Sequence, residues 1–200
     1  MGGDEGRARR AAARALLQAH RAREGLGRSR GGLTTKIHAA ADLCCRPLVR
    51  VASPGQRSDP RGLAPVMARL RIGRAGPGRP RTRPHRVLAD KAYSCAGIRA
   101  LLRDRGIKAT IPVKDDKPAT APRGRAGGRP PVFDAGAYKA RNSVERMINR
   151  LKRARAVALR TDKRLYVYTG TLNVASIDLW LRDHTRARRA TGPRTSDPEH

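Results

Sequence analysis

The chain has 200 residues, which is enough for one domain of ordinary size with tails and hardly enough for two. Its 45 lysines and arginines outnumber 16 acidic residues, so the formal net charge is +29 and a polyanion such as nucleic acid is the first partner to expect. With 3% aromatic residues and no apolar run of membrane-spanning length, the composition argues against base-stacking surfaces for RNA and against a membrane protein, and it favours duplex DNA in the cytoplasm.

The first third of the chain predicts a basic leader, a hairpin and a helix. Residues 1–26 are rich in alanine and arginine and predict a marginal helix or a disordered segment outside the core. The glycines of GRSRGG, residues 27–32, then break the chain, and the β-prone runs LTTKIHAAAD and RPLVRVASP predict a hairpin. Four apolar residues follow at helical spacing and predict a short packed helix: Leu63, Val66, Met67 and Leu70.

The middle of the chain predicts a βαβ unit. Residues 73–84 are too rich in glycine and proline for regular structure and predict a basic loop. A short apolar strand then stops at Asp90, SCAGIRALLRDRG predicts a helix closed by Gly106, and IKATIPV predicts the next strand. A strand, a helix and a strand within this length are typical of a parallel pair with a right-handed crossover.

The last third predicts two helices around a second basic loop. Residues 114–131 form the loop, Asp134 is a candidate N-cap, and YKARNSVERMINRLK reads as one helix. LYVYTGTLNVASIDLWL predicts a further apolar helix, and residues 184–200 are expected to be disordered.

A polar stripe on the helix YKARNSVERMINRLK indicates a site. Four of its residues lie on one side of a helical wheel, beside the apolar face: Tyr138, Arg141, Glu145 and Lys152. Asp90 is the natural counterpart, because the carboxyl end of a strand in an α/β sheet borders the ligand-binding crevice. Two carboxylates there can hold Mg²⁺ or Mn²⁺ and support phosphodiester chemistry. The alternative is that Asp90 is a turn or cap residue and that Glu145 forms an ordinary helix ion pair with Arg141.

Two of these segments resemble motifs of a known family. VLADKAY at Val87 to Tyr93, and the pattern Y-x2-R-x3-E-x6-K that begins at Tyr138, resemble the second and third acidic motifs of bacterial insertion-sequence DDE transposases of insertion sequence groups four and five. GRSRGGLTTKIH, GQRSDP and GIKATIPVK are similar to further segments of that family, and the likeness runs over residues 27–181.

The resemblance implies an α/β, RNase H-like domain over residues 27–183, with a mixed sheet flanked by helices. It implies a DNA transposase that cuts transposon ends and transfers the strand to target DNA by two-metal chemistry, acting on duplex DNA as a homodimer. Asp90 would be the second metal-binding acid and Glu145 the third, with Mg²⁺ or Mn²⁺ as the cofactor. Tyr138, Arg141 and Lys152 would surround the phosphate.

The sequence departs from the family at the first acid. The family carries an aspartate on an apolar strand before the hairpin, and upstream of Gly27 this chain offers only Asp4, Glu5 and Glu24. Asp42, in the hairpin turn, is a weak substitute. The chain is therefore interpreted as an N-terminally truncated transposase or as the downstream product of an element read in two frames. The alternatives are a non-catalytic basic remnant that binds DNA and an RNA-associated structural protein.

Two arginine-rich loops flank the expected site and predict contacts to the DNA backbone. The residues are Arg79, Arg81, Arg83, Arg123, Arg125 and Arg129. The alternative is that these loops are solvated linkers, and only eight of the 45 basic residues are lysine, so GC-rich coding alone is another source of the arginines. The histidines His38 and His85 are isolated, and the three cysteines lack zinc-site spacing.

Overall fold

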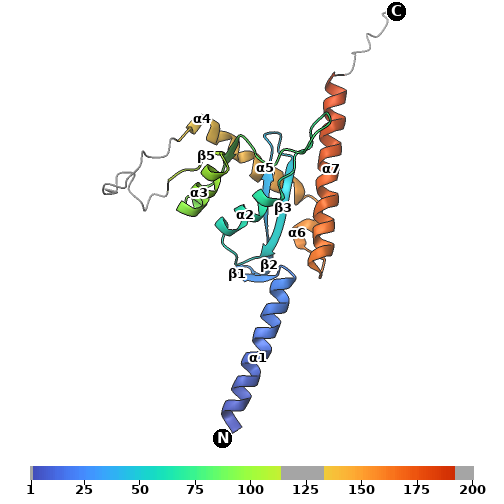
Figure 1. Ribbon diagram of the computed structural model, residues 1–200. Coiled ribbons are helices and arrows are strands. Elements are labelled where there is room, and N and C mark those ends of the chain that lie inside the picture. The colour runs from blue at the N-terminus through green and yellow to red at the C-terminus, as the bar shows by residue number, and fades with distance from the viewer. Residues whose placement is uncertain (1, 114–132, 192–200) are drawn as a thin grey trace, which may run out of the picture.

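The computed structural model describes residues 2–113 and 133–191, and over these ranges the chain is an α/β protein, as expected (Figure 1). Its helices and strands, in chain order, are α1 (Gly2–Arg23), β1 (Gly27–Ser29), β2 (Gly32–Ala41), β3 (Pro47–Pro54), α2 (Pro60–Arg69), β4 (Arg86–Leu88), α3 (Ala96–Asp104), β5 (Lys108–Thr110), α4 (Ala135–Tyr138), α5 (Asn142–Leu151), α6 (Arg155–Leu159) and α7 (Leu165–Thr191). Two 3-10 helices, η1 (Lys91–Tyr93) and η2 (Lys139–Arg141), complete the set.

The strands confirm the hairpin and the parallel pair. Strands β2 and β3 are antiparallel, with Thr35 opposite Pro54 and a register shift between Ala40 and Ala41. Strands β4 and β5 are parallel and joined through α3. The expected break at residues 27–32 is wrong, because β1 pairs antiparallel with the start of β2 across a tight turn in which Gly32 takes a φ of +102°.

The strands do not assemble into one mixed sheet within the described residues. They form a three-stranded sheet in the order β1-β2-β3 and a separate two-stranded sheet, β4-β5. The physical reason is pairing: β2 bonds to β1 and β3, β4 bonds to β5, and no described strand is hydrogen-bonded to both sheets.

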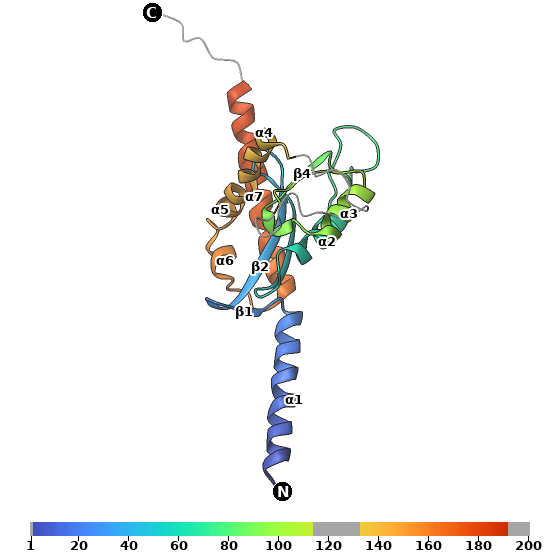
Figure 2. The same cartoon turned by 90° about the vertical axis from the view of Figure 1, so that its left-hand side faces the viewer.

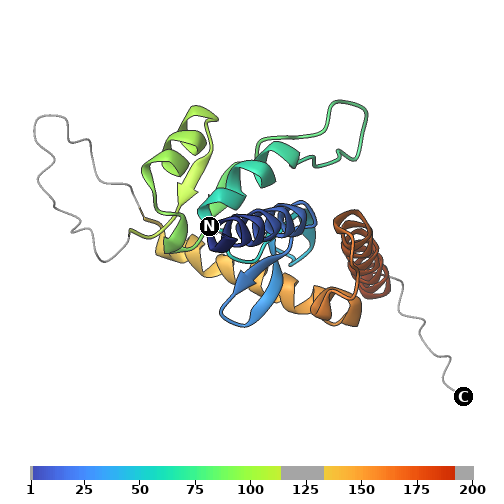
Figure 3. The ribbon, with the colours of Figure 1, turned by 90° about the horizontal axis from the view of Figure 1, so that it is seen from below.

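Two apolar clusters pack on opposite sides of the β2–β3 hairpin. The first brings α2 and α3 together with β3 and the ends of β4 and β5: Val49, Leu63, Val66, Met67, Leu70, Ala89, Ile98, Leu102, Ile107 and Ile111. The second brings α5, α6 and α7 to the other side: Cys45, Met147, Leu151, Val157, Tyr168, Leu172 and Leu179. Seen from below in Figure 3, α2 and α3 lie on one side of β2, and α5 and α6 on the other. The predicted packing of α2 is confirmed, and the short α6 was not expected.

His38 is a buried packing residue of this arrangement. It is 5% exposed, and its Nε2 lies 2.8 Å from Ser53 Oγ in a hydrogen bond between β2 and β3. A Cβ at Gly62 of α2 would lie 2.1 Å from His38 Nδ1, so only glycine lets the helix approach this closely. Burial lowers the pKa of His38 against a smaller opposing effect of Asp59, while Lys36 and Arg57 also lower it.

The stability of the fold is expected to fall on mild acidification because of His38. Its folded pKa lies below its unfolded value, so the stabilisation is complete above about pH 6.5 and is lost as the pH falls below that value and through the folded pKa. We expect the melting temperature to drop between pH 7.5 and 5.5, and His38→Gln to lose much of that drop. An equal drop in His38→Gln would assign the pH dependence to other groups.

The two long helices extend from opposite ends of the body. Helix α1 is confirmed as helical, and its side chains from Arg7 to Arg23 are exposed (Figure 1). It leaves the body at the end where α7 begins and runs away from it (Figure 2). Glu24 joins them, since its carboxylate lies 3.0 Å from Arg164 Nη1 and accepts the Leu165 N–H at 2.7 Å.

Disorder directly after Asp183 is a wrong prediction, because α7 continues to Thr191. Alanine and arginine are good helix formers and sustain the helix there. Residues 192–200 lie outside the described residues, and the domain boundaries at 26 and 183 stay predictions. None of the helices in the described part of the chain is long and apolar enough to cross a membrane.

Candidate active site

The segment that carries the polar stripe is not one continuous helix. Helix α4 ends at Tyr138, η2 spans Lys139–Arg141, and α5 begins at Asn142. The predicted cap is confirmed, since Asp134 Oδ1 accepts the Ala137 N–H at 2.9 Å. Asp134 also pairs with Arg86 of β4 at 2.5 Å, which ties the start of this segment to the parallel sheet. These bonds, that of Ala137 first, lower the pKa of Asp134.

Arg141 brings the two predicted acids to one place. Its Nη1 lies 2.8 Å from Glu145 Oε1 and 3.9 Å from Asp90 Oδ2. Asp90 follows β4 and also caps η1 by accepting the Lys91 N–H, so its cap role is confirmed as well. The ion pair between Arg141 and Glu145 is likewise present. Asp90 is thus a cap residue and Glu145 forms a helix ion pair, as the alternative interpretation predicted. The two acids nevertheless approach the same guanidinium from two separate parts of the chain.

An aromatic ring lies beside the guanidinium on the side of α4. The ring of Tyr138 lies 5.6 Å from Arg141 Cζ, and the ring of Phe133 lies 5.2 Å from that of Tyr138. A guanidinium over an aromatic face is held by the ring quadrupole. Arg141 is thus positioned by two carboxylates and a phenol ring.

Lys152 does not join this cluster. It is the C-cap of α5, and its side chain is exposed, without a hydrogen bond or ion pair among the described residues. It follows Glu145 by two turns, a rise of about 10 Å along the helix. Of the five predicted catalytic residues, the structure therefore brings four together, and Lys152 is the exception.

The site is open to solvent. The side chains of Asp90 and Glu145 are 52% and 56% exposed, and that of Arg141 is 28% exposed. Such a surface suits a large ligand that brings its own groups to the carboxylates. A half-buried neighbour is Tyr93, whose pKa rises to about 12 mainly through burial, with smaller effects of Asp59 and Asp90.

The carboxylates offer an incomplete set of metal ligands. No group of three histidines, cysteines or acids that could hold a metal ion occurs among the described residues. Two carboxylates fit one Mg²⁺, which takes its other oxygens from water and phosphate, but a pair of ions needs a further carboxylate.

Other acids near the hairpin are engaged elsewhere. Asp59 pairs with Lys36 at 2.9 Å, and Asp42 pairs with Arg46 at 2.6 Å. Both are therefore neutralised by their own cations, and the suggested replacement of the first acid by Asp42 finds no support. Glu24 is held at the start of α7.

The loop at residues 73–84 is partly ordered. The backbones of Ile72 and Arg81 exchange two hydrogen bonds of 2.9 Å, and Arg83 Nη1 donates to the Arg105 carbonyl at 3.4 Å. Arg79, Arg81 and Arg83 are exposed. The other predicted DNA contacts, Arg123, Arg125 and Arg129, lie outside the described residues. Backbone contact by all six stays a prediction.

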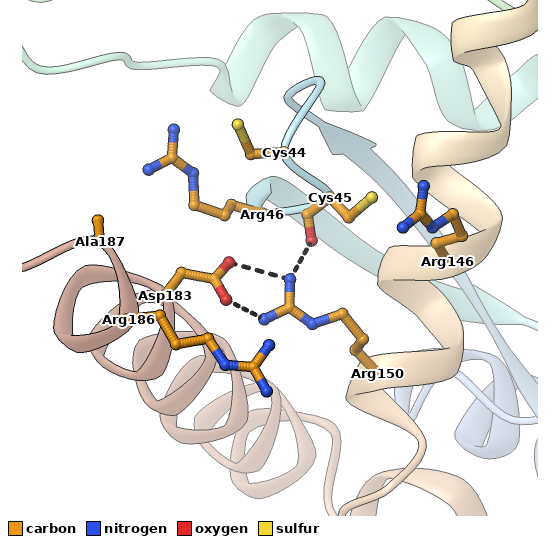
Figure 4. Close-up of a pocket in the computed structure, with 8 residues that line it drawn as sticks. All are labelled: Cys44, Cys45, Arg46, Arg146, Arg150, Asp183, Arg186 and Ala187. Carbon is orange, nitrogen blue, oxygen red and sulfur yellow. Dashed lines mark hydrogen bonds and ion pairs between the residues drawn. The ribbon is translucent and has the colours of Figure 1, made fainter. Parts of the chain in front are cut away.

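A second basic cluster was missed by the sequence reasoning. A hollow of about 420 Å³ lies between the β2–β3 turn, α5 and α7, and its lining includes Arg146, Arg150 and Arg186 (Figure 4). The sequence signal was the spacing of Arg146 and Arg150, which places both on one side of α5 away from Glu145. The residues of α7 that line the hollow, Asp183 and Arg186, lie in a segment that was expected to be apolar or disordered.

Comparisons with known proteins identify the family of the chain. The family model described as "Transposase DDE domain" matches residues 16–171, a range that contains the whole cluster around Arg141. A "Putative transposase for insertion sequence element IS6501" from Brucella ovis is 32% identical over 150 residues, which cover 75% of this chain and 100% of that protein. No solved structure matches. The chain belongs to the family of DDE transposases of insertion sequences.

Proposed function

We propose that this chain is the part of an insertion-sequence transposase that cuts transposon ends and joins them to target DNA, working in the cytoplasm as a homodimer on duplex DNA. The family supports a DNA substrate. The observation that carries the chemistry is the convergence of Asp90 and Glu145 on Arg141. In this proposal the core is RNase H-like, and the separate sheets are its two parts.

Each residue of the cluster has a task in the proposal. Asp90 and Glu145 would hold a divalent cation, and Arg141 would release one carboxylate and turn toward a phosphate oxygen. Tyr138, whose ring centre lies 5.6 Å from Arg141 Cζ, would keep the guanidinium near the strand to be cut. Lys152, two turns further along the same helix, would hold a neighbouring phosphate.

Divalent metal ions are the general cofactor of this family, and Mg²⁺ or Mn²⁺ fits two carboxylate ligands completed by water and phosphate oxygens. When bound, such an ion polarises the phosphoryl oxygen and activates the attacking hydroxyl. Two ions acting together would need a third acid, which the described residues do not place at the site.

The second candidate is a DNA-binding remnant that does no chemistry. It is favoured by the absence of a third carboxylate beside Asp90 and Glu145 in the described parts of the chain. Both candidates predict salt-sensitive DNA binding, so metal-dependent cleavage and metal binding are needed to separate them.

The test is cleavage of supercoiled plasmid in Mg²⁺, in Mn²⁺ and in EDTA, read as nicked and linear products. The transposase proposal expects nicking with a divalent metal and none in EDTA. Paramagnetic resonance of free Mn²⁺ gives a second readout, because Asp90→Asn should weaken Mn²⁺ binding whether or not DNA is cut. If the wild-type protein binds DNA but does not cut it, and binds Mn²⁺ no more tightly than Asp90→Asn does, the chain is the non-catalytic remnant.

A further inference from the structure

The hollow between the β2–β3 turn, α5 and α7 adjoins a second, larger one. The first hollow shares Arg150, Asp183 and Arg186 with a second one of about 690 Å³ that runs between α5 and α7. We call the two together the arginine groove. Figure 4 shows side chains from all three elements pointing into its first part.

The walls of the arginine groove are joined by one ion pair and by a hydrogen bond from the same guanidinium. Arg150 of α5 donates to both carboxylate oxygens of Asp183 on α7, at 2.9 and 2.5 Å, and to the Cys45 carbonyl in the turn at 3.3 Å. The two charged side chains are only 23% and 20% exposed, and the pairing with Asp183 raises the pKa of Arg150. One guanidinium therefore holds three elements in place.

The turn is held in the same way from its other side. Asp42 accepts from Arg46 Nε at 2.6 Å and from the Arg46 N–H at 2.8 Å. The Arg46 guanidinium covers the ring of Trp180 at 4.2 Å, and the indole N–H donates to the Pro47 carbonyl at 2.9 Å. The groove is thus a preformed shape, and a ligand would not have to order it.

Three positive charges in the groove remain uncompensated. Arg46, Arg150 and Arg182 are each paired with an aspartate: Asp42, Asp183 and Asp178. The remaining guanidiniums are exposed and have no hydrogen bond or ion pair in the parts of the chain that the structure describes: Arg146, Arg153 and Arg186. The three paired charges are neutralised by their own aspartates, so these other three are left for a ligand.

We propose that the arginine groove binds the phosphate backbone of duplex DNA, as a contact separate from the acids at Arg141. A guanidinium group can donate two parallel hydrogen bonds to the oxygens of one phosphate. Neutralising phosphates also releases counterions from the DNA, which raises the affinity of the protein for it. The groove is open, and the nearby indole of Trp180 is covered by Arg46, so the groove offers phosphate contacts and no stacking platform for bases. The inference rests on the proposed function for its choice of DNA.

The groove and the acids share helix α5. Arg146 directly follows Glu145, which separates their side chains by about 100° around the helix axis. A duplex lying against α5 would therefore contact the groove on one flank while its strand to be cut lies at Glu145 on the other. The groove would set the position of the DNA relative to the acids, a positioning role and not a catalytic one.

The test is the salt dependence of DNA binding, measured by fluorescence anisotropy of the full chain on a labelled duplex in EDTA. Arg146→Ala/Arg153→Ala/Arg186→Ala should lower the slope of log K against log of salt concentration by about 0.9 for each phosphate that is no longer neutralised. The matched control is Arg28→Ala/Arg61→Ala/Arg69→Ala, which removes three exposed arginines from β1 and α2. It should keep the wild-type slope. The corresponding triple lysine variant of the groove should also keep most of it.

The outcomes separate this inference from the proposed function. Equal slopes in the groove variant and the control, with circular dichroism showing both folded, would overturn the groove even if the chain cuts DNA with metal. A lower slope in the groove variant supports it even if no cleavage is found. The proposal would also be overturned if the groove variant lost affinity for polyglutamate but kept the wild-type salt dependence of DNA binding. That result would indicate that the groove binds an acidic protein.

Discussion

Glu145→Gln is expected to lower metal-dependent nicking of supercoiled DNA by about 10³-fold or more. The substitution keeps the shape of the side chain and removes the charge that would hold the cation. A bound metal stabilises the transition-state charge by several kcal/mol, and each 1.4 kcal/mol changes the rate about tenfold. Its ion pair with Arg141 is largely exposed, so the melting temperature should change little. Gel analysis of nicked product over time measures the rate.

Asp104→Asn is the matched control for this prediction. Asp104 is 72% exposed on α3, and its ion pair with Arg103 is long, at 3.9 Å. The variant should cut DNA as the wild type does and bind it with the same salt dependence. Nicking by Glu145→Gln at the rate of Asp104→Asn would remove Glu145 from the set of metal ligands.

Leu151→Ala is expected to destabilise the protein by about 2–5 kcal/mol, the range for deleting a buried leucine side chain. Leu151 is 1% exposed and belongs to the cluster in which Tyr168 and Leu172 of α7 are buried. This cluster packs against the buried face of α5, and so it fixes the position of the helix that carries Glu145. Urea unfolding followed by circular dichroism measures the change.

Leu159→Ala provides the comparison on a neighbouring helix. Leu159 is 62% exposed on α6, and substitutions at such positions usually change stability by less than about 0.5 kcal/mol. If the two variants unfolded at the same urea concentration, the packing of α5 against α7 would be contradicted.

The sequence predicted the elements whose signals are local. The apolar spacing from Leu63 to Leu70 and the helix end at Gly106, whose φ is +62°, depend on neighbours in the chain, and both appear as expected. The motif around Asp90 and Glu145 was also found, because the residue types at fixed offsets are visible without coordinates. Arg141 as the joint partner of both acids was not, since the distance to Asp90 depends on how α4, η2 and β4 meet.

The wrong predictions concern elements that depend on distant partners. Strand β1 has three residues with little strand propensity, and it forms because Gly27–Ser29 can pair with β2. The helix from Tyr138 was expected to be continuous, and Asn142 and Ser143, which favour helix starts, follow the break. The charged end of α7 looked like a disordered tail, although Asp183 is bonded to Arg150 across the groove. None of these pairings can be read from one segment alone.

The carboxylate of Glu24 couples the two longest helices mechanically. Glu24 directly follows α1, and its carboxylate accepts the N–H of Leu165, the first residue of α7, so the end of α1 is anchored at the start of α7. Helix α1 has 22 residues and is about 33 Å long. A molecule that grips its far end therefore has a long lever arm on α7, the helix that carries Asp183 and Arg186.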